Sequence, residues 1–156
     1  MAIMSAGILM YRHGDGGLDV LLVHPGGPFW RNRDLGAWSI PKGELNDGED
    51  PEEAARREFA EELGTKATGQ LRPLGQVRQR GGKLVLAYAL EGTLDADAVR
   101  SNEIPIEWPP RSGRTISVPE IDRAEWFPLA LAREKILASQ QPFLERLIAQ
   151  GRRAAT

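Results

Sequence analysis

The chain has 156 residues, of which 41% are hydrophobic and 27% charged, and its formal net charge is −2. This composition is typical of one soluble globular domain that is long enough to bury a core, and it excludes the broad basic field that holds a nucleic-acid polymer. The absence of cysteine excludes disulfides, thiol catalysis and cysteine-bound zinc.

The first part of the chain alternates apolar runs with turn-forming segments. The two runs IMSAGILMY and LDVLLVHP predict buried strands, and the RHGDGG segment between them has the glycines of a hairpin turn. We expect a loop at 26–36, a short strand at 37–41 and a polar loop at 42–50.

A helix is predicted at 51–63 from its end signals. Asp50 is a favourable N-cap, Pro51 suits the first helical position, and Glu53 completes a capping box. Gly64 follows at the position where helices commonly end. The helix has one apolar stripe at i+4 spacing, made of Ala55, Phe59 and Leu63.

The second part of the chain predicts more strands, then helices. The expected elements are strands at 73–79, 83–92 and 124–129, an irregular stretch at 92–122, amphipathic helices at 129–140 and 142–150, and a loose tail at 151–156. This order predicts an α/β fold in which helices cover a mixed sheet, as a single domain over residues 1–150.

Three glutamates crowd one patch of the predicted helix. Glu58, Glu61 and Glu62 lie at i, i+3 and i+4, where like charges cost roughly 0.2–0.5 kcal/mol per pair. One interpretation is a solvated charged face with local pairs such as Arg57 with Glu61. The other is a site for a divalent cation such as Mg²⁺, which prefers carboxylate oxygens and reverses the repulsion.

The spacing around these acids favours the second interpretation. Gly43 is followed after five residues by Glu49, and after seven more by Arg57-Glu58, Phe59, Ala60, Glu61-Glu62, Leu63 and Gly64. This pattern resembles the signature of the Nudix hydrolases at every charged and glycine position. The one departure is Thr65, where the family has an aliphatic residue, and it concerns packing more than chemistry.

The resemblance implies a fold and a set of roles. It implies an α/β/α sandwich with a mixed sheet, and hydrolysis of a nucleoside diphosphate linked to another group. Direct metal ligands would be Glu58 and Glu62, with Glu61 as a ligand or a catalytic base, and a backbone carbonyl of Lys42 or Gly43 adding an oxygen. The resemblance also implies that Arg57 orients the acids and that Glu49 and Gly64 have structural roles.

A further acid is expected downstream of the motif. Several Nudix enzymes use a glutamate shortly before a strand-forming tryptophan, and here Glu120 precedes Trp126 by six residues. Glu103 and Glu107 are alternatives. We favour Glu120 among the three, and the other interpretation of each is a loop acid in water.

The segments flanking the motif bear on the substrate. The Trp-x-x-Pro-Lys-Gly run before it resembles that of dinucleoside polyphosphate hydrolases and of the diphosphoinositol phosphatase branch, which makes Lys42 a candidate phosphate contact. Trp38 of this run is expected in the core. Two loops combine aromatic residues with arginine, and either bind nucleoside and phosphates or pack as a lid: Trp30, Arg31 and Arg33 in one, and Arg111, Ser112 and Arg114 in the other. The WPPRSG segment resembles a subgroup of predicted pyrophosphohydrolases and indicates no substrate.

The expected function is therefore hydrolysis of a phosphoanhydride with Mg²⁺, or Mn²⁺ as a substitute, with dinucleoside polyphosphates ahead of nucleoside triphosphates. Alternatives are diphosphoinositol polyphosphates, oxidised nucleotides, or nucleotide binding without turnover. We expect a monomer or homodimer in the cytoplasm, with no membrane or nucleic-acid polymer as partner, because no apolar run approaches the roughly 20 residues of a membrane span and no targeting segment is recognisable.

Overall fold

The computed structural model describes residues 3–155, with the side chains of Arg80 and of residues 152–155 left out. The strands are β1 (Met4–Gly14), β2 (Gly17–Pro25), β3 (Lys42–Glu44), β4 (Arg72–Arg78), β5 (Leu84–Glu91), β6 (Glu103–Glu107), β7 (Thr115–Pro119) and β8 (Ile121–Pro128). The helices are α1 (Pro51–Leu63), α2 (Leu129–Lys135) and α3 (Gln141–Ala155), and short 3₁₀ turns lie at η1 (Arg80–Gly82), η2 (Ala96–Ala98) and η3 (Ala138–Gln140).

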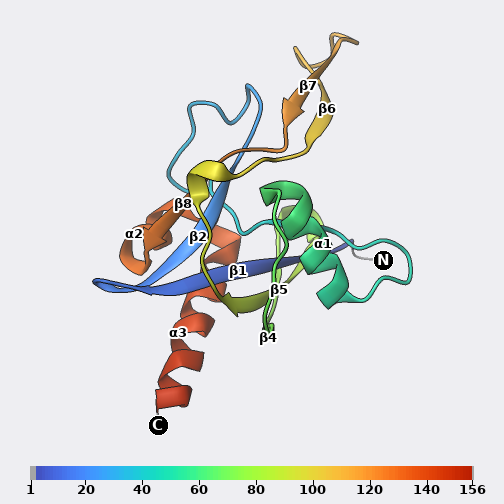
Figure 1. Cartoon of the computed structure of the whole chain (residues 1–156). Coiled ribbons are helices and arrows are strands. Elements are labelled where there is room, and N and C mark those ends of the chain that lie inside the picture. The colour runs from blue at the N-terminus through green and yellow to red at the C-terminus, as the bar shows by residue number, and fades with distance from the viewer. Residues whose placement is uncertain (1–2, 156) are drawn as a thin grey trace.

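A mixed six-stranded sheet forms the centre of the domain (Figure 1). Its order is β4-β5-β1-β2-β8, and β3 pairs with β1 beside this path. The pair β1–β5 is parallel, whereas β1–β2, β1–β3, β2–β8 and β4–β5 are antiparallel. The central β1 therefore carries β5 along one edge and β3 followed by β2 along the other.

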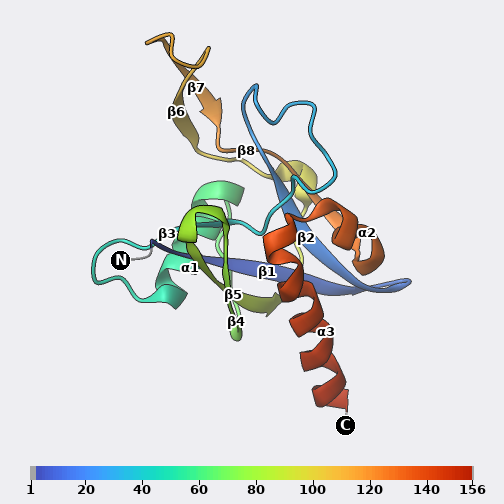
Figure 2. The ribbon, with the colours of Figure 1, turned by 180° about the vertical axis from the view of Figure 1, so that it is seen from behind.

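Helices cover both faces of this sheet, which confirms the predicted α/β/α architecture. Successive side chains of a strand point to opposite faces, so Ile8 packs with Phe59 of α1, and Leu9 packs with Phe143 of α3. Figure 2 shows α3 crossing in front of β1, seen from the side away from α1. The buried stripe predicted for α1 is confirmed, since Ala55, Phe59 and Leu63 are almost fully buried.

The ends of α1 are those predicted. The Asp50 carboxylate accepts a hydrogen bond from the Glu53 amide at 3.2 Å, and Pro51 opens the helix. Gly64 has φ 75°, and its N–H donates to the Ala60 carbonyl at 2.8 Å. A side chain at Gly64 would also meet the Arg100 carbonyl oxygen at 2.7 Å, so glycine is required there by conformation and by space.

The stretch at 92–122 was predicted to be irregular, and this is wrong. It contains the antiparallel hairpin β6–β7, in which Ile104 pairs with Val118 and Ile106 with Ile116. The hairpin projects from the body of the domain beside the loop that joins β2 to β3 (Figure 1). Its strands have only five residues each, and proline in both of them hides the strand pattern.

Other boundaries also differ from prediction. No strand forms at 37–41, where Trp38 and Ser39 make only isolated bridges to Ile136 and Val23. The expected polar loop begins instead with β3, since Gly43 pairs with Ala6 of β1. Strand β8 starts earlier than expected, at Ile121.

The C-terminal helices also differ from the prediction. The helix expected at 129–140 ends at Lys135, because Ile136 turns into the core with extended backbone and Leu137 donates to the Trp38 carbonyl. Helix α3 runs through Ala155 into the predicted loose tail, and Thr156 lies outside the described residues. In residues 3–155, no helix has the length and apolar character of a membrane span.

Candidate active site

The acidic patch of α1 lies against β3, and a glycine makes this approach possible. Because β3 pairs with β1, Gly43 sits directly beside Glu58 of the helix. A Cβ at Gly43 would lie 2.0 Å from the Glu58 carboxyl carbon, which no real side chain permits. Glycine therefore lets the helix carboxylates lie close to the backbone oxygens of the strand.

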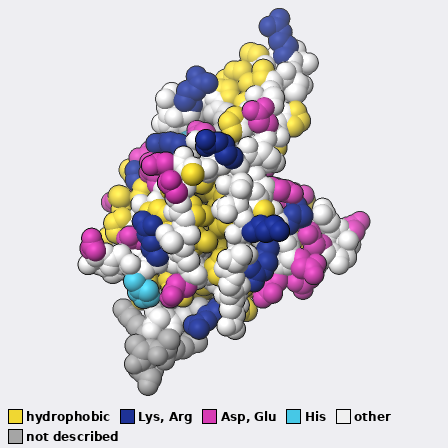
Figure 3. All heavy atoms as spheres, viewed as in Figure 1, with side chains coloured by type: hydrophobic (Ala, Val, Ile, Leu, Met, Phe, Trp, Pro, Cys, Tyr) yellow, Lys and Arg dark blue, Asp and Glu magenta, His cyan; other side chains and the backbone are white. Residues whose placement is uncertain are grey.

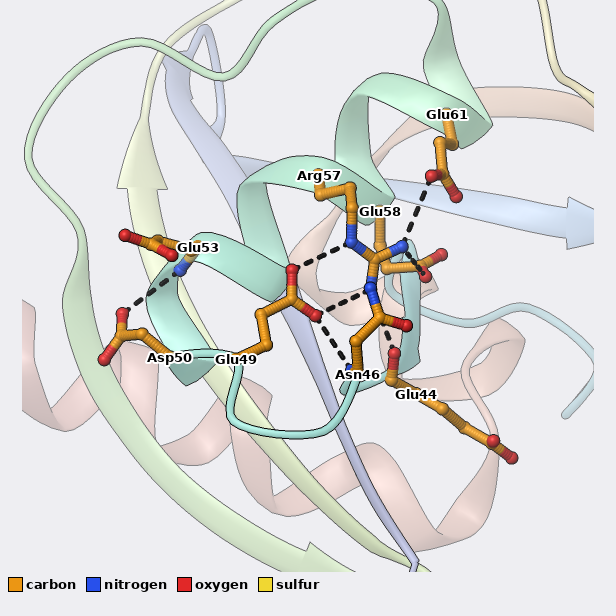
Figure 4. A network of polar contacts seen from close by, with 8 residues as sticks. All are labelled: Glu44, Asn46, Glu49, Asp50, Glu53, Arg57, Glu58 and Glu61. Atoms are coloured by element: carbon orange, nitrogen blue, oxygen red, sulfur yellow. Dashed lines mark hydrogen bonds and ion pairs between the residues drawn. The ribbon is translucent and has the colours of Figure 1, made fainter.

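Arg57 holds the acids around it in a fixed arrangement (Figure 4). Its guanidinium donates twice to the Glu49 carboxylate, both at 2.9 Å, and to the Glu44 carbonyl at 3.0 Å. It also donates to the Glu58 carboxylate at 2.8 Å and to that of Glu61 at 3.3 Å. The backbone amide of Asn46 donates to the Glu49 carboxylate at 2.9 Å, so the loop before α1 is tied to the residue that holds Arg57. Together with the Arg57 guanidinium, this amide lowers the pKa of Glu49 from 4.5 to about 2.

Two of the three crowded glutamates are buried. Glu58 and Glu62 are 7% and 4% exposed, and the Oε2 atom of Glu62 has no hydrogen-bond partner in the described structure. Burial raises the pKa of Glu58, and burial together with the charges of Glu120 and Glu58 raises the pKa of Glu62 well above its ordinary value. An ionised carboxylate kept out of water needs a positive partner, which is the condition that a cation site meets.

Glu120 lies at the same place although it is distant in sequence. It occupies the junction of β7 and β8, where its carbonyl accepts from the Gly26 amide at 3.0 Å and its own amide donates to the Asn102 carbonyl at 2.9 Å. Its charge acts on Glu58, Glu62 and Lys42. The junction of β7 and β8 therefore places Glu120 close to the acidic patch of α1.

A cavity of about 470 Å³ opens next to these groups. Lys42, Glu62 and Glu120 line one part of it, and burial lowers the pKa of the Lys42 ammonium while the nearby carboxylates oppose this change. Most of the remaining wall is apolar and includes Trp30 and Ile106. The volume lies within the roughly 300–1,000 Å³ of small-molecule sites.

The chain matches the NUDIX domain family model over residues 1–147. The chain belongs to the Nudix family. It is 32% identical to an RNA pyrophosphohydrolase of Brucella anthropi over 132 residues, which cover 74% of this chain and 70% of that protein. It is 42% identical to an RNA pyrophosphohydrolase of Rhodospirillum rubrum over 66 residues, which span only 40% of this chain and 38% of that protein.

Solved Nudix structures share the fold. A C. elegans Ap4A hydrolase in a binary complex superposes with a TM-score of 0.66 at 24% identity, covering 95% of this chain and 98% of that one. The Nudix domain of Shewanella oneidensis NrtR, solved with ADP-ribose, superposes with a TM-score of 0.64 at 21% identity, covering 100% of this chain and 90% of that one. The family and the fold predicted from the Nudix motif are thus confirmed, and with them the assignment to a family of hydrolases.

The other candidate acids lie in the hairpin and are engaged there. The Glu103 carboxylate accepts from the Ser117 hydroxyl at 2.7 Å. The Glu107 carboxylate accepts from the amides of Arg111 and Gly113 at 3.0 and 3.2 Å, and so stabilises the hairpin turn. Of the three alternatives, only Glu120 is among the described residues that line the cavity.

The structure does not gather the predicted arginines around the cavity. Arg111, Ser112 and Arg114 are exposed at the tip of the hairpin. Arg33 stacks over the Phe29 ring at 4.4 Å, and Arg31 is exposed. Trp30 alone of the two loop sets lines the cavity, and phosphate binding by the others stays a prediction. Trp38 is in the core, as predicted.

Two features of this structure were not predicted from the sequence. His24 is fully buried, with its Nδ1 atom 2.8 Å from Asp122 Oδ1 and its Nε2 atom 2.6 Å from the Arg33 carbonyl oxygen. It thereby joins β2 and β8 to the 26–36 loop. Ile104 and Ile106 of the hairpin line the cavity, and their alternation with polar residues in NEIPIEW was the available signal.

The residues of the Nudix motif fit a divalent cation. In the described part of the chain, no three acidic or histidine side chains lie together as a metal-binding group, and Arg57 pairs with the carboxylates of Glu58 and Glu61. However, Glu62 has a buried, unpartnered oxygen, and the glycine at position 43 lets the Glu58 carboxylate lie against the strand backbone. Carboxylate and carbonyl oxygens are the donors that Mg²⁺ and Mn²⁺ take.

Proposed function

We propose that this chain is a pyrophosphohydrolase that uses Mg²⁺, or Mn²⁺ in its place, to cleave a phosphoanhydride bond in a nucleotide. The observation that carries this proposal is the cavity itself. Its polar part holds Lys42, Glu62 and Glu120 together, and the rest of its wall suits an uncharged group. Phosphates and a nucleoside would occupy these two parts.

The cation would be held by Glu58, Glu61 and Glu62, with the Gly43 carbonyl as a further oxygen ligand. A bound divalent cation lowers the pKa of a coordinated water and neutralises charge that develops on the phosphate oxygens. Arg57 orients Glu58 and Glu61 through its hydrogen bonds, and Glu49 fixes Arg57 in turn. These contacts keep the carboxylates of the acidic patch close to one another, where the cation would bind.

The chain's own groups would act on the substrate as follows. The Lys42 ammonium contacts a phosphate oxygen as a point charge. The Glu120 carboxylate accepts a proton from the attacking water, whose oxygen bonds to phosphorus as the bridging P–O bond breaks. The leaving phosphate departs with the electron pair of that bond. Glu120 is preferred to Glu103 and Glu107 because both of these are engaged within the hairpin, and Glu61 is the alternative base.

The lining of the cavity favours a nucleotide over a diphosphoinositol polyphosphate. Among the described residues, Lys42 is the one basic side chain of the lining. A polyphosphorylated inositol would need several cations around its ring, whereas a nucleoside needs an apolar surface for its base. Within the nucleotides we favour dinucleoside polyphosphates, because of the Trp-x-x-Pro-Lys-Gly run at residues 38–43.

A product assay tests this proposal. The purified protein would be incubated with Mg²⁺ or Mn²⁺ and diadenosine tetraphosphate, common and oxidised nucleoside triphosphates, ADP-ribose, a diphosphoinositol phosphate and a 5′-triphosphorylated oligoribonucleotide. The oligonucleotide is included because the names of the curated relatives refer to RNA, although the net charge predicts no polymer partner. The expected result is cleavage of diadenosine tetraphosphate to ATP and AMP.

Glu62→Gln supplies the control for the site. It removes a charge that the cation needs, and we expect turnover to fall at least about 100-fold. Because the carboxylate is buried and its Oε2 atom has no hydrogen-bond partner among the described residues, the metal-free variant should melt no lower than the wild type. Glu52→Gln, an exposed acid on the same helix, should keep full activity. Full activity of Glu62→Gln would refute the assigned site, and nucleotide binding without turnover of any substrate would favour a regulator.

A further inference from the structure

The β6–β7 hairpin has one apolar face and one polar face. Its cross-strand pairs Ile104–Val118 and Ile106–Ile116 place four aliphatic side chains on the same face, since paired residues of two strands point the same way. The opposite face carries alternating residues such as Glu103 and Ser117, which bond to each other. A two-stranded hairpin is only marginally stable alone, so an apolar face on a projecting hairpin needs an explanation.

Part of this apolar face lines the cavity of the candidate active site. Ile104 and Ile106 line the cavity, whereas Ile116 does not and is 37% exposed. Figure 3 shows hydrophobic side chains gathered over the projecting hairpin, with basic side chains near its tip. The hairpin is thus one apolar wall of the site.

The loop at 26–30 forms a second apolar wall of the cavity. Phe29 and Trp30 both line the cavity, with their rings 5.0 Å apart at an interplanar angle of 83°. Phe29 is 55% exposed, which is a large aromatic surface to leave in water. Trp30 is half-buried and packs against the core behind it, so the wall is anchored.

The two walls meet at a glycine. A Cβ at Gly27 would lie 3.4 Å from Ile106 Cδ1 and 3.6 Å from Val118 Cγ2, so the loop backbone and the hairpin are in near contact there. Glu120, which follows the hairpin, lies in the polar part of the same cavity. The apolar part of the cavity, which we call the apolar slot and which Trp30, Ile104 and Ile106 line, is therefore continuous with the polar part that we assign to the phosphates.

This apolar slot has few groups that could read the edge of a base. Ser39 is in the lining, but its hydroxyl donates to the Ile40 carbonyl at 2.7 Å and accepts from Gln140 at 3.0 Å. The remaining polar side chains of the lining are Lys42, Glu62 and Glu120, which face the phosphates, and the Trp30 indole. Stacking and apolar contact work with any base, because every base has a π face.

We propose that the hairpin and the 26–30 loop together form a nucleobase site that holds the base between Ile104 and Ile106 on one side and Trp30 on the other, with little discrimination among bases. The proposal rests on the proposed function for the position of the phosphates. It argues against an enzyme that selects oxidised nucleotides, because such selection requires hydrogen bonds to the base edge.

Binding of nucleoside monophosphates tests this site without turnover, since these compounds have no phosphoanhydride to cleave. Calorimetric titration with Mg²⁺ present would compare AMP, GMP, CMP and UMP with ribose 5-phosphate. We expect the four nucleotides to bind within about tenfold of one another, and each at least about tenfold more tightly than ribose 5-phosphate. Equal affinity for ribose 5-phosphate, or a strong preference for one base, would overturn the proposal.

Three variants localise the effect. Ile106→Ser and Trp30→Ala should each remove most of the advantage over ribose 5-phosphate and leave the affinity for ribose 5-phosphate unchanged. Ile116→Ser is the matched control, because Ile116 pairs with Ile106 on the same hairpin face but lies outside the cavity. Equal losses in both hairpin variants would refute direct contact. Nucleotide binding without hydrolysis of any substrate would refute the proposed function alone, whereas hydrolysis with no contribution from the base would refute this site alone.

Discussion

Gly43 and Glu58 approach each other so closely that the glycine hydrogen occupies the only space between them. A Cβ added to Gly43 would come within 2.0–2.4 Å of all three carboxyl atoms of Glu58. A side chain at position 43 would push the Glu58 carboxylate away from β3, since the backbone of Gly43 is fixed by its pairing with Ala6.

Gly43→Ala should therefore damage the metal site more than the fold. We expect the affinity for Mn²⁺ and the turnover to fall at least about tenfold, as when an outer partner of a metal ligand is lost. Titration with Mn²⁺ followed by calorimetry measures the first effect. Gly16→Ala is the matched control, because a Cβ there meets nothing within 4 Å and should change neither quantity. Unchanged Mn²⁺ affinity in Gly43→Ala would contradict the placement of the cation beside Glu58.

The pair of Arg57 and Glu49 predicts a dependence of stability on pH. The pKa of Glu49 is lowered from 4.5 to about 2, mainly by its hydrogen bonds from Arg57. A carboxyl whose pKa is lower in the folded protein stabilises the fold above its unfolded pKa, and this contribution is lost as the pH falls toward the folded value.

Glu49→Gln should accordingly melt below the wild type at pH 7, with the difference shrinking below about pH 4.5 and vanishing near pH 2. Thermal unfolding of both proteins between pH 7 and pH 2 measures this. Asp47→Asn changes an exposed acid in the same loop and should melt like the wild type throughout. A difference that stays constant with pH would mean that Glu49 acts through packing and not through its charge.

His24 predicts an effect on stability away from the acidic patch. Its ring is fully buried, with the Nδ1 atom in contact with the Asp122 carboxylate and the Nε2 atom in contact with the Arg33 carbonyl oxygen. His24→Leu keeps similar bulk but leaves both oxygens without this partner, and should lower the free energy of unfolding by about 2 kcal/mol. Urea unfolding measures the loss. His13→Leu, at an exposed histidine, should stay within about 0.5 kcal/mol of the wild type, and an equal effect of both substitutions would contradict the role of the buried contacts.

The helix of the Nudix motif could be predicted in detail because its signals are local. Asp50, Pro51 and Gly64 act on the backbone within a few residues of themselves, and the stripe of Phe59 and Leu63 follows from helical spacing. The hairpin at 103–119 was not predicted, because its strands are short and contain proline, which masks the alternation of Ile104 and Ile106 with polar residues, and because its stability depends on pairing. The prediction of a short strand at 37–41 was wrong for a related reason, since this segment makes only isolated bridges to Val23 and Ile136.

By itself, the sequence determined the family and the crowding of Glu58, Glu61 and Glu62 on one helix, because both depend on spacing over a short stretch of chain. It determined the α/β fold through the order of the strands and helices. Only the tertiary structure decided which distant residues complete the cavity. It brought Glu120 to Glu62 and held Glu103 and Glu107 in the hairpin. It also brought Ile106 and Trp30 to the wall of one cavity, which none of the predicted arginines lines. The physical reason is that strand pairing and burial, not local pattern, fix the contacts between segments far apart in the chain.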